Sequence, residues 1–333
     1  MPSMHGYRFT RAGAANEVLE FGQYPIPQPA AGEVQVRLAV SAVNPTDTKR
    51  RTDGRELPRF GQITPNNDGS GWIAAVGEGV STSRIGERVW LFAAQAGRPD
   101  GTGAQFCTVP AAYAVPLPDN TSLAIGACLG VPAVTAHRAV FADGPVNGQT
   151  VLVTGGTGRV GRYAVQIALQ AGARVIASCR TDQDAQDLST LGVKDIIMRN
   201  ETDIASRTLE MTNDIGVDRF IDVAFGANVQ DAPRIIKPNG VLISYGSDYN
   251  PEPVFPFIQF MYRNITLRPF SIMGMPEAAK LQAFHDITNY LQLDILSHAI
   301  SVRLPFNDMV KAHELIEKGD LRGCVLVDIA DEA

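Results

Sequence analysis

Three glycines with a fixed spacing are the residues of this sequence most clearly suited to a chemical task. Gly156, Gly158 and Gly161 satisfy the pattern G-x-G-x-x-G. In this pattern one glycine permits a tight turn, one lets the backbone approach a pyrophosphate, and one lets a helix pack closely on a strand. The phosphates then accept hydrogen bonds from N–H groups at a helix N-terminus, where the dipole favours negative charge. The spacing therefore predicts a dinucleotide site.

The segments on either side of these glycines have the character that the fingerprint requires. A short apolar, β-branched run, 151–153, precedes the turn, and a segment with apolar residues at helical spacing, 163–170, follows it. This context predicts a strand, a glycine-rich turn and a helix in succession. A glycine-rich connection in a different α/β fold is the alternative interpretation.

The residues at the end of the second predicted strand bear on which dinucleotide binds. NAD-binding sheets carry Asp or Glu about 20 residues beyond the glycines, where it binds the ribose 2′-hydroxyl. Here that place holds Ser178-Cys179-Arg180-Thr181, without an acid. A guanidinium can bind a 2′-phosphate, which a carboxylate would repel. Arg180 therefore favours NADPH over NADH, unless it is only a surface arginine, and Arg199 beyond the third strand is a second candidate for the same phosphate.

The pattern of apolar residues divides the chain into three parts. Residues 1–122 alternate with period two between prolines, show no helical rhythm of any length, and predict an irregular β-barrel-like domain. Residues 123–266 alternate apolar strands with helices, which predicts a doubly wound parallel sheet, the Rossmann architecture. Residues 267–333 contain two predicted helices, Glu277–Leu291 and Asn307–Lys318 with Asn307 as N-cap, and a final strand. We expect this segment to return to the first domain.

Composition narrows the class of protein further. The 333 residues carry a net charge of −6, which argues against nucleic acid as the main partner. The four cysteines have no C-x-x-C spacing, so neither a disulfide framework nor a structural zinc site is expected. No apolar run is long enough to span a membrane. We expect a cytoplasmic protein that acts on a small molecule without a membrane partner.

Several further motifs carry a resemblance to a known family. They are Asn44-Pro45-Thr46-Asp47, Asn67-Asp68-Gly69-Ser70-Gly71, Gly86-Glu87-Arg88-Val89, residues 131–138 and Ala312-His313-Glu314. Together with the glycine turn, they resemble the zinc-free quinone oxidoreductase branch, similar to ζ-crystallin, of the medium-chain dehydrogenase/reductase superfamily. The resemblance implies a GroES-like catalytic domain before the Rossmann domain, and a homodimer or a dimer of dimers formed through the latter.

The same resemblance implies roles for particular residues. Asn44 and Asp47 would line the nicotinamide end of the site, although without the resemblance a turn with Asx bonding would be the better explanation of both. Thr135 would contact the nicotinamide, or else serves helix packing. The residues implied to hold the pyrophosphate or to lie beside the cofactor are Gly156, Thr157, Gly158, Arg159, Val160, Gly161, Ser178, Tyr245, Gly246 and Ser247.

Zinc-bearing relatives differ from this chain in the residues that bind the metal. They carry a Cys-His pair in the first motif and Gly-His-Glu in the second, where this chain has Asn44-Pro45 and Asn66-Asn67-Asp68. A catalytic zinc needs three protein ligands drawn mainly from Cys, His and carboxylate. We therefore expect no metal.

Four positions depart from the pattern of the branch. Lys49 and Arg55 stand where tyrosines are common, so they either make the substrate mouth cationic or point to water. Asp184 stands where some members carry a lysine for the 2′-phosphate, which weakens the preference for NADPH unless Arg180 and Arg199 compensate. Cys324 replaces a lysine before the last strand.

These residues predict hydride transfer from NADPH to a quinone. Without a metal, hydrogen-bond donors must polarise the acceptor, and a well-placed donor contributes about 2.7–4 kcal/mol. Asn44 and Lys49 are the candidate donors. A reductase of 2-alkenals or enones is the first alternative, and an NADPH-binding structural or regulatory protein with little turnover is the second. Aromatic residues between 249 and 270 suit either a stacking pocket or the core and subunit interface.

Overall fold

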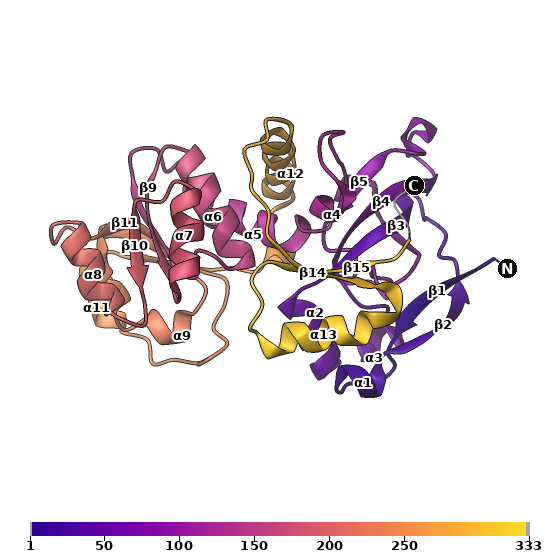
Figure 1. Ribbon diagram of the computed structural model, residues 1–333, viewed down its shortest axis with the longest axis horizontal. Helices are drawn as coiled ribbons and strands as arrows, with labels where there is room; N and C mark the ends of the chain where they lie inside the picture. The colour runs from indigo at the N-terminus through magenta and orange to yellow at the C-terminus, as the bar shows by residue number, and fades with distance from the viewer. Residues whose placement is uncertain (1, 331–333) are drawn as a thin grey trace. The chain divides into compact units, whose positions relative to one another are not determined.

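The computed structural model describes residues 2–330 and divides the chain into two compact units. The first unit consists of Met1–Val131 and Phe284–Ala333, and the second is Pro132–Ala283. Figure 1 shows the elements of each unit in the order of the chain. No helix among the described residues is long and apolar enough to cross a membrane.

The first unit is built on a seven-stranded sheet in the order β14-β15-β3-β4-β5-β7, with β6 paired to β3. Most of its neighbouring strands are antiparallel, and β14 and β15 are parallel. A separate hairpin-like pair is formed by β1 and β2. The strands are β1 (Ser3–Arg8), β2 (Glu20–Pro25), β3 (Glu33–Val43), β4 (Asp68–Val76), β5 (Arg88–Leu91), β6 (Phe106–Pro110), β7 (Ala114–Pro116), β14 (Ile300–Pro305) and β15 (Cys324–Asp328).

The helices of this unit correct two expectations from the sequence. The first 122 residues do contain helices, the longest being α2 (Pro45–Asp53), a polar segment whose signals are its caps rather than an apolar stripe. Helix α13 (Met309–Lys318) begins after N-cap Asp308, so Asn307 lies in a preceding 3₁₀ turn and is not the cap. The others are α1 (Ala15–Val18), α3 (Leu57–Phe60) and α4 (Leu123–Gly126), while α5 (Gly130–Phe141) and α12 (Glu277–Gln292) include residues of both units.

The second unit contains a six-stranded sheet in the order β10-β9-β8-β11-β12-β13, and all its strands are parallel. The predicted doubly wound sheet is confirmed. The order reverses between β8 and β11, and ligands of such sheets bind beyond the carboxyl ends of the strands at this point. The strands are β8 (Thr150–Val153), β9 (Arg174–Cys179), β10 (Asp195–Met198), β11 (Val217–Asp222), β12 (Ile236–Ser244) and β13 (Thr266–Pro269).

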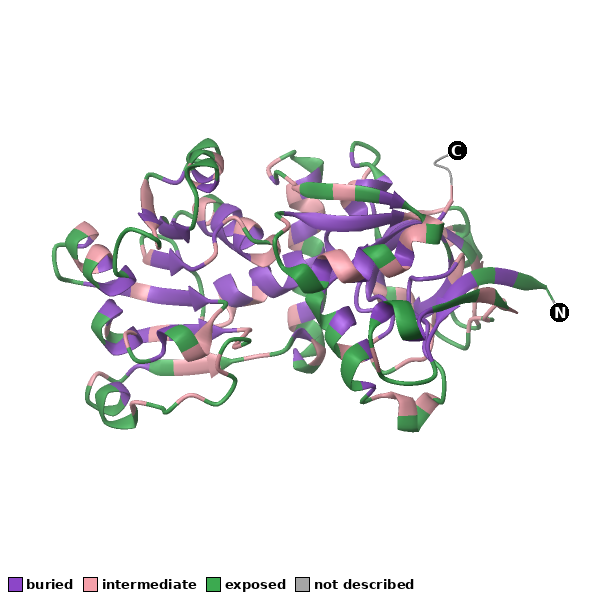
Figure 2. Cartoon of the chain, turned by 60° about the horizontal axis from the view of Figure 1, so that its bottom comes forward, coloured by how far each residue is buried: buried purple, intermediate pink, exposed green. Residues whose placement is uncertain are grey.

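Helices cover the second sheet and bury its apolar strands. Figure 2 shows these strands largely buried, with the helices exposing their outer sides. Leu152, Phe220 and Leu242 come from adjacent strands and share one core cluster with residues of α8 and α10. The helices are α6 (Arg159–Gln170), α7 (Asp182–Thr190), α8 (Ile204–Met211), α9 (Phe225–Asn228), α10 (Ala232–Ile235) and α11 (Phe257–Tyr262).

Candidate active site

In the first unit, Asn44 and Asp47 close the first turn of α2. Asn44 is the N-cap, Pro45 follows at the first helical position, and Asp47 Oδ2 accepts a hydrogen bond from Asn44 N at 2.7 Å. Proline suits that position because its absent N–H would have no helical partner there. The Asp47 carboxylate also faces the positive end of the helix dipole. This closed turn leaves the buried Asn44 side chain available to other groups.

Those other groups belong to the start of β4. Asn44 Nδ2 donates to Asp68 Oδ2 at 2.7 Å, and Asn67 Nδ2 donates to Asp47 Oδ1 at 2.5 Å. The backbone N–H of Val131 donates to both oxygens of Asp68, at 2.8 and 2.9 Å. Asp68 is fully buried, as is Asn67. Two amides and two carboxylates therefore form one buried group, which we call the Asn44–Asp68 cluster (Asn44, Asp47, Asn67 and Asp68).

The two carboxyl groups of this cluster titrate far from their ordinary range. Burial raises the pKa of Asp47 to about 6, against hydrogen bonds from Asn44 and Asn67 that lower it. Burial raises the pKa of Asp68 well above its usual value, and the negative charge of Asp47 raises it further. Neighbouring carboxyl groups of this kind titrate as a pair, because one negative charge disfavours the second.

A buried histidine supports the segment that leads into β4. His313 of α13 is fully buried, and its Nε2 lies 3.0 Å from Asn66 Oδ1. Burial lowers the pKa of His313 to about 3, with Arg51 as a second cause, so the ring is neutral near pH 7. Asn66 adopts a left-handed conformation with φ of 77° and donates from Nδ2 to Ser41 Oγ at 3.0 Å. The motif around His313 thus holds the backbone immediately before Asn67.

The two cations expected near the substrate mouth lie outside this cluster. Lys49 is exposed on α2. Arg55 is also exposed, and its Nε donates to Asp53 Oδ2 at 2.6 Å. Asn44, in contrast, combines burial with an amide donor.

The donors at the zinc positions of related enzymes do not suit zinc. Asn44 and Asn67 offer amides, and both oxygens of Asp68 already accept hydrogen bonds. Catalytic zinc sites use three ligands from Cys, His and carboxylate. Among the described residues there is no group of three or more His, Cys, Asp or Glu side chains arranged to hold a metal ion.

In the second unit, the predicted glycine turn forms a cradle that side chains would fill. Gly155 has φ of 63°, and a Cβ on Gly161 would lie 2.0 Å from the Gly155 carbonyl oxygen. Gly158 is the N-cap of α6 and is exposed, so the following amide groups have no capping side chain over them. Thr157, Arg159 and Val160 line the same turn and are partly exposed. The cradle suits phosphate groups.

The end of β9 lies directly against this turn. Ser178 accepts hydrogen bonds from two glycine N–H groups, from Gly156 to its carbonyl at 2.9 Å and from Gly155 to its Oγ at 3.3 Å. Ser178 therefore helps to shape the cradle. Its own side chain is buried beneath the turn.

The two arginines predicted to select the dinucleotide follow adjacent strands, β9 and β10. Arg199 N donates to Cys179 O at 3.0 Å, and Asn200 Nδ2 donates to Arg180 O at 2.6 Å. Arg180 is exposed and Arg199 half-buried. The loops that carry Arg180 and Arg199 are thus tied together. Asp184, the residue that argued against NADPH, has its carboxylate 2.8 Å from the hydroxyl of Thr181, the N-cap of α7.

The remaining predicted cofactor residues occupy two further segments. Tyr245, Gly246 and Ser247 follow β12 and pair with the turn after β11, where Gly246 O accepts from Phe225 N and Ser247 Oγ from Gly226 N, both at 2.9 Å. Burial raises the pKa of the Tyr245 phenol. Thr135 is a buried residue of α5.

Asp222 and Asn228 are polar residues that the sequence did not single out. Asp222 ends β11 and is fully buried, and its Oδ1 accepts from Thr154 Oγ1 at 2.6 Å and from Asn228 Nδ2 at 2.7 Å. Asn228 Oδ1 accepts in turn from Arg199 Nη2 at 3.1 Å. The sequence signal that could have identified Asp222 is its position at the carboxyl end of a strand beside the point where the strand order reverses.

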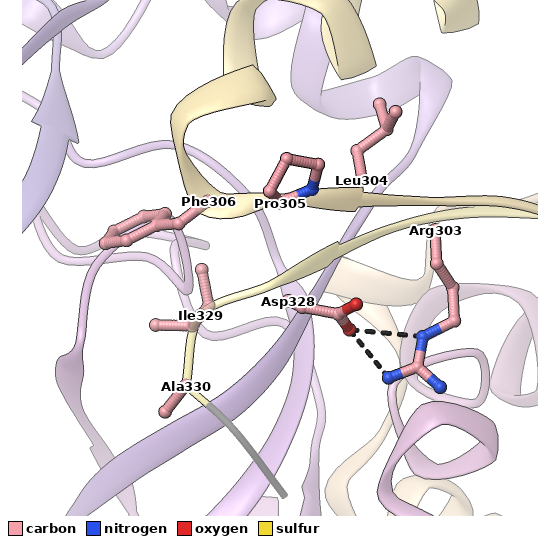
Figure 3. Close-up of a pocket in the computed structure, with 7 residues that line it drawn as sticks. All are labelled: Arg303, Leu304, Pro305, Phe306, Asp328, Ile329 and Ala330. Carbon is pink, nitrogen blue, oxygen red and sulfur yellow. Dashed lines mark hydrogen bonds and ion pairs between the residues drawn. The ribbon is translucent and has the colours of Figure 1, made fainter.

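The first unit also contains a pocket that the predicted site residues do not line. It has a volume of about 480 Å³ and is lined by residues 303–306 and 328–330, at the ends of β14 and β15. Figure 3 shows the ion pair at its edge, in which Arg303 Nη2 lies 2.8 Å from Asp328 Oδ1. None of the predicted site residues lines this pocket.

Comparison with family models matches both parts of the chain. The model described as alcohol dehydrogenase GroES-like domain matches residues 30–119, and the one described as zinc-binding dehydrogenase matches residues 160–289. Both expected domain types are thereby confirmed, the GroES-like barrel and the dinucleotide-binding parallel sheet.

Individual relatives extend over nearly the whole chain. A quinone oxidoreductase of Rattus norvegicus is 26% identical over 295 residues, which is 87% of this chain and 86% of the relative. A solved mycobacterial quinone oxidoreductase is 26% identical with a TM-score of 0.85, and covers 98% of this chain and 99% of its own. A mycobacterial protein solved in complex with NADPH is also 26% identical, with a TM-score of 0.84 over 98% of this chain and 99% of its own.

The raised pKa of Asp47 predicts a pH dependence of stability. A folded-state pKa of about 6, above the ordinary aspartate value of 3.8, means that the folded protein binds more protons than the unfolded chain between these values. The contribution of Asp47 to the free energy of unfolding should therefore fall as pH rises from about 4 to 6, by up to about 3 kcal/mol at 1.36 kcal/mol per pKa unit, while buried His313 contributes with the opposite sign over the same range. Denaturant unfolding of the wild type and of Asp47→Asn across pH 4–7 measures this.

Relative to the wild type, the stability of Asp47→Asn should change with a more positive slope over this range, because the Asp47 contribution is lost while those of Asp68, His313 and the other shifted groups remain. The control is Asp53→Asn, since the pKa of exposed Asp53 is lowered by its pairing with Arg55 and its contribution has the opposite sign. Identical slopes for the wild type and Asp47→Asn would show that Asp47 is ionised normally in the folded protein.

Proposed function

Because this chain belongs to the medium-chain dehydrogenase/reductase superfamily and is an oxidoreductase, we propose that it is an NADPH-dependent reductase that transfers hydride to a quinone without a metal. The observation that carries the proposal is the glycine cradle at the N-terminus of α6, followed by arginines instead of an acid after β9. The relatives named as quinone oxidoreductases support the choice of acceptor.

NADPH supplies the hydride when it is bound, and the chain supplies the phosphate and acceptor contacts. The amide groups at Gly156–Gly161 would bind the pyrophosphate, with Ser178, Tyr245, Gly246 and Ser247 nearby in the same unit. Arg180 and Arg199 carry the positive charge that a 2′-phosphate requires. Thr135 would contact the nicotinamide.

The acceptor carbonyl would be polarised by hydrogen bonding. Asn44 Nδ2 has two N–H groups and gives one to Asp68 Oδ2. The second is the proposed donor to the acceptor oxygen, and Lys49 is a further candidate. Quinones and enones suit such a site, because their developing negative charge is delocalised and needs less stabilisation than that of a simple ketone. Asp47 orients Asn44 by fixing its backbone N–H.

The first experiment compares cofactors and acceptors. NADPH and NADH oxidation is followed with 1,4-benzoquinone, a naphthoquinone and a small enone, each with and without a chelator. We expect turnover that is faster with NADPH, fastest with a quinone and unchanged by the chelator. Fastest turnover with the enone would assign the protein as an enone reductase, inhibition by the chelator would reject the metal-free mechanism, and NADPH binding without any turnover would favour a binding protein.

The second experiment tests Asn44 as the donor. Asn44→Ala should lower kcat/KM for the best acceptor by about 10²–10³, as loss of an oxyanion-hole donor does. Thr46→Ala, an exposed residue of the same helical turn, is the matched control and should retain full activity. If Asn44→Ala stays within threefold of the wild type while remaining folded, the acceptor is polarised by another group.

We also propose that the protein forms a homodimer through the second unit. Strand β13 is an edge of the parallel sheet, and the segment before it exposes Tyr249, Val254, Phe257, Ile258 and Tyr262. Exposed edges and contiguous apolar surface are characteristic of interaction sites. The aromatic residues of this stretch therefore suit a subunit interface better than a stacking pocket.

The mass in solution tests the dimer. We expect twice the mass of the 35.8 kDa chain by light scattering, and a shift toward monomer in Ile258→Asp. Ile215→Asp replaces an equally exposed isoleucine outside this segment and should remain dimeric. A monomeric wild type at micromolar concentration would exclude the proposed interface.

A further inference from the structure

The side chain of Arg199 connects two segments that follow non-adjacent strands of the sheet. Arg199 follows β10, the first strand in the sheet order, yet its Nη2 donates to Asn228, the last residue of α9, which follows the fourth strand, β11. The contact therefore joins the segments that follow the first and fourth strands, and β9 and β8 lie between these strands in the sheet. Ligands of such sheets bind at these ends.

The orientation of the Asn228 amide is determined by its two neighbours. Asn228 is 1% exposed, so both ends of the amide need partners inside the protein. Its Nδ2 donates to Asp222 Oδ1 and its Oδ1 accepts from Arg199 Nη2. The reversed amide would set two acceptors against each other at Asp222 and two donors against each other at Arg199. The carboxylate thus forces the carbonyl oxygen to face the guanidinium.

The same carboxylate reaches the phosphate cradle. Asp222 Oδ1 accepts from Thr154 Oγ1, and Thr154 directly precedes Gly155 at the start of the turn. Thr154 Oγ1 also accepts from Val223 N at 3.1 Å. Burial raises the pKa of Asp222, while hydrogen bonds from Thr154, Ala224 and Asn228 and the charge of Arg199 lower it. One buried group therefore orients both the glycine turn and the amide that holds Arg199.

We propose that Asn228 is a positioning residue for recognition of the NADPH 2′-phosphate. A guanidinium has five N–H donors in a fixed fork, and Asn228 accepts one of them, which leaves the others to the phosphate. Asn228 acts only through Arg199 and does not itself contact the cofactor. This inference rests on the proposed NADPH dependence.

A double-mutant cycle on binding tests the proposal. The Kd values of NADPH and NADH are measured by nicotinamide fluorescence, without an acceptor, for the wild type, Asn228→Ala, Arg199→Ala and the double variant. Each single substitution should weaken NADPH binding about tenfold, the scale of one hydrogen bond to a charged group. NADH binding should change less than twofold, and the double variant should bind NADPH no more weakly than Arg199→Ala.

Any other result would contradict the proposal, and the different results can be told apart. Additive effects in the double variant, or equal weakening of NADPH and NADH by Asn228→Ala, would give Asn228 a purely structural role. If Arg199→Ala alone changes the preference, the inference fails while NADPH dependence stands. If the wild type binds both dinucleotides equally, the proposed cofactor preference fails and the inference with it.

A second variant covers the case in which Asn228→Ala does not fold. Arg199→Lys keeps the positive charge but lacks the fork that Asn228 and the phosphate would share. It should lose NADPH affinity nearly as far as Arg199→Ala. Retention of the wild-type Kd for NADPH in Arg199→Lys would show that charge alone suffices and would overturn the positioning role.

Discussion

The first unit is organised around a carboxylate that has no access to water. Asp68 is fully buried, and an ionised carboxylate in such a place is destabilising by several kcal/mol unless donors surround it. Asn44 and the N–H of Val131 supply them, from positions 24 and 63 residues away in the chain. The residue before Val131 must be glycine, because a Cβ on Gly130 would lie 2.2 Å from Asp68 Oδ1. These contacts hold the chain segments around Asn44, Asp68 and Val131 in fixed positions relative to one another.

The second unit repeats this arrangement with a different carboxylate. Asp222 is also fully buried and also orients an asparagine, together with the hydroxyl of Thr154. In both units an asparagine Nδ2 donates to the buried carboxylate, which fixes the orientation of the amide. Buried ionic groups contribute little net stability, and orientation is a better-supported reason for keeping them. Here that orientation concerns Asn44 in one case and Arg199 in the other.

The sequence predicted those parts of the structure that local pattern determines. Apolar periodicity and the glycine spacing located the strands of the parallel sheet and the turn after β8. Helix α2 was missed because it consists of a proline and eight polar residues and has no apolar stripe, and its signals lie in the Asn-Pro-Thr-Asp start. The contacts of Asp68 with Asn44 and Val131, of Asp222 with Thr154 and of Asn228 with Arg199 were missed because these partners are distant in sequence. Such partners come together only when the strands pair, and the types of the individual residues do not reveal which strands pair.

The Asn44–Asp68 cluster also explains why introducing zinc ligands at two positions would not be enough to create a zinc site. Asp68 stands where zinc-bearing relatives have the glutamate of their second motif, and its oxygens are taken by Asn44 Nδ2 and Val131 N. Cysteine or histidine at positions 44 and 67 would remove the amide donors to Asp68 and Asp47 and leave buried carboxylates with fewer partners. The surroundings are therefore adapted to neutral donors. This chemistry agrees with the proposed acceptors, whose developing charge is delocalised, because hydrogen bonds stabilise a developing oxyanion less than a metal ion does.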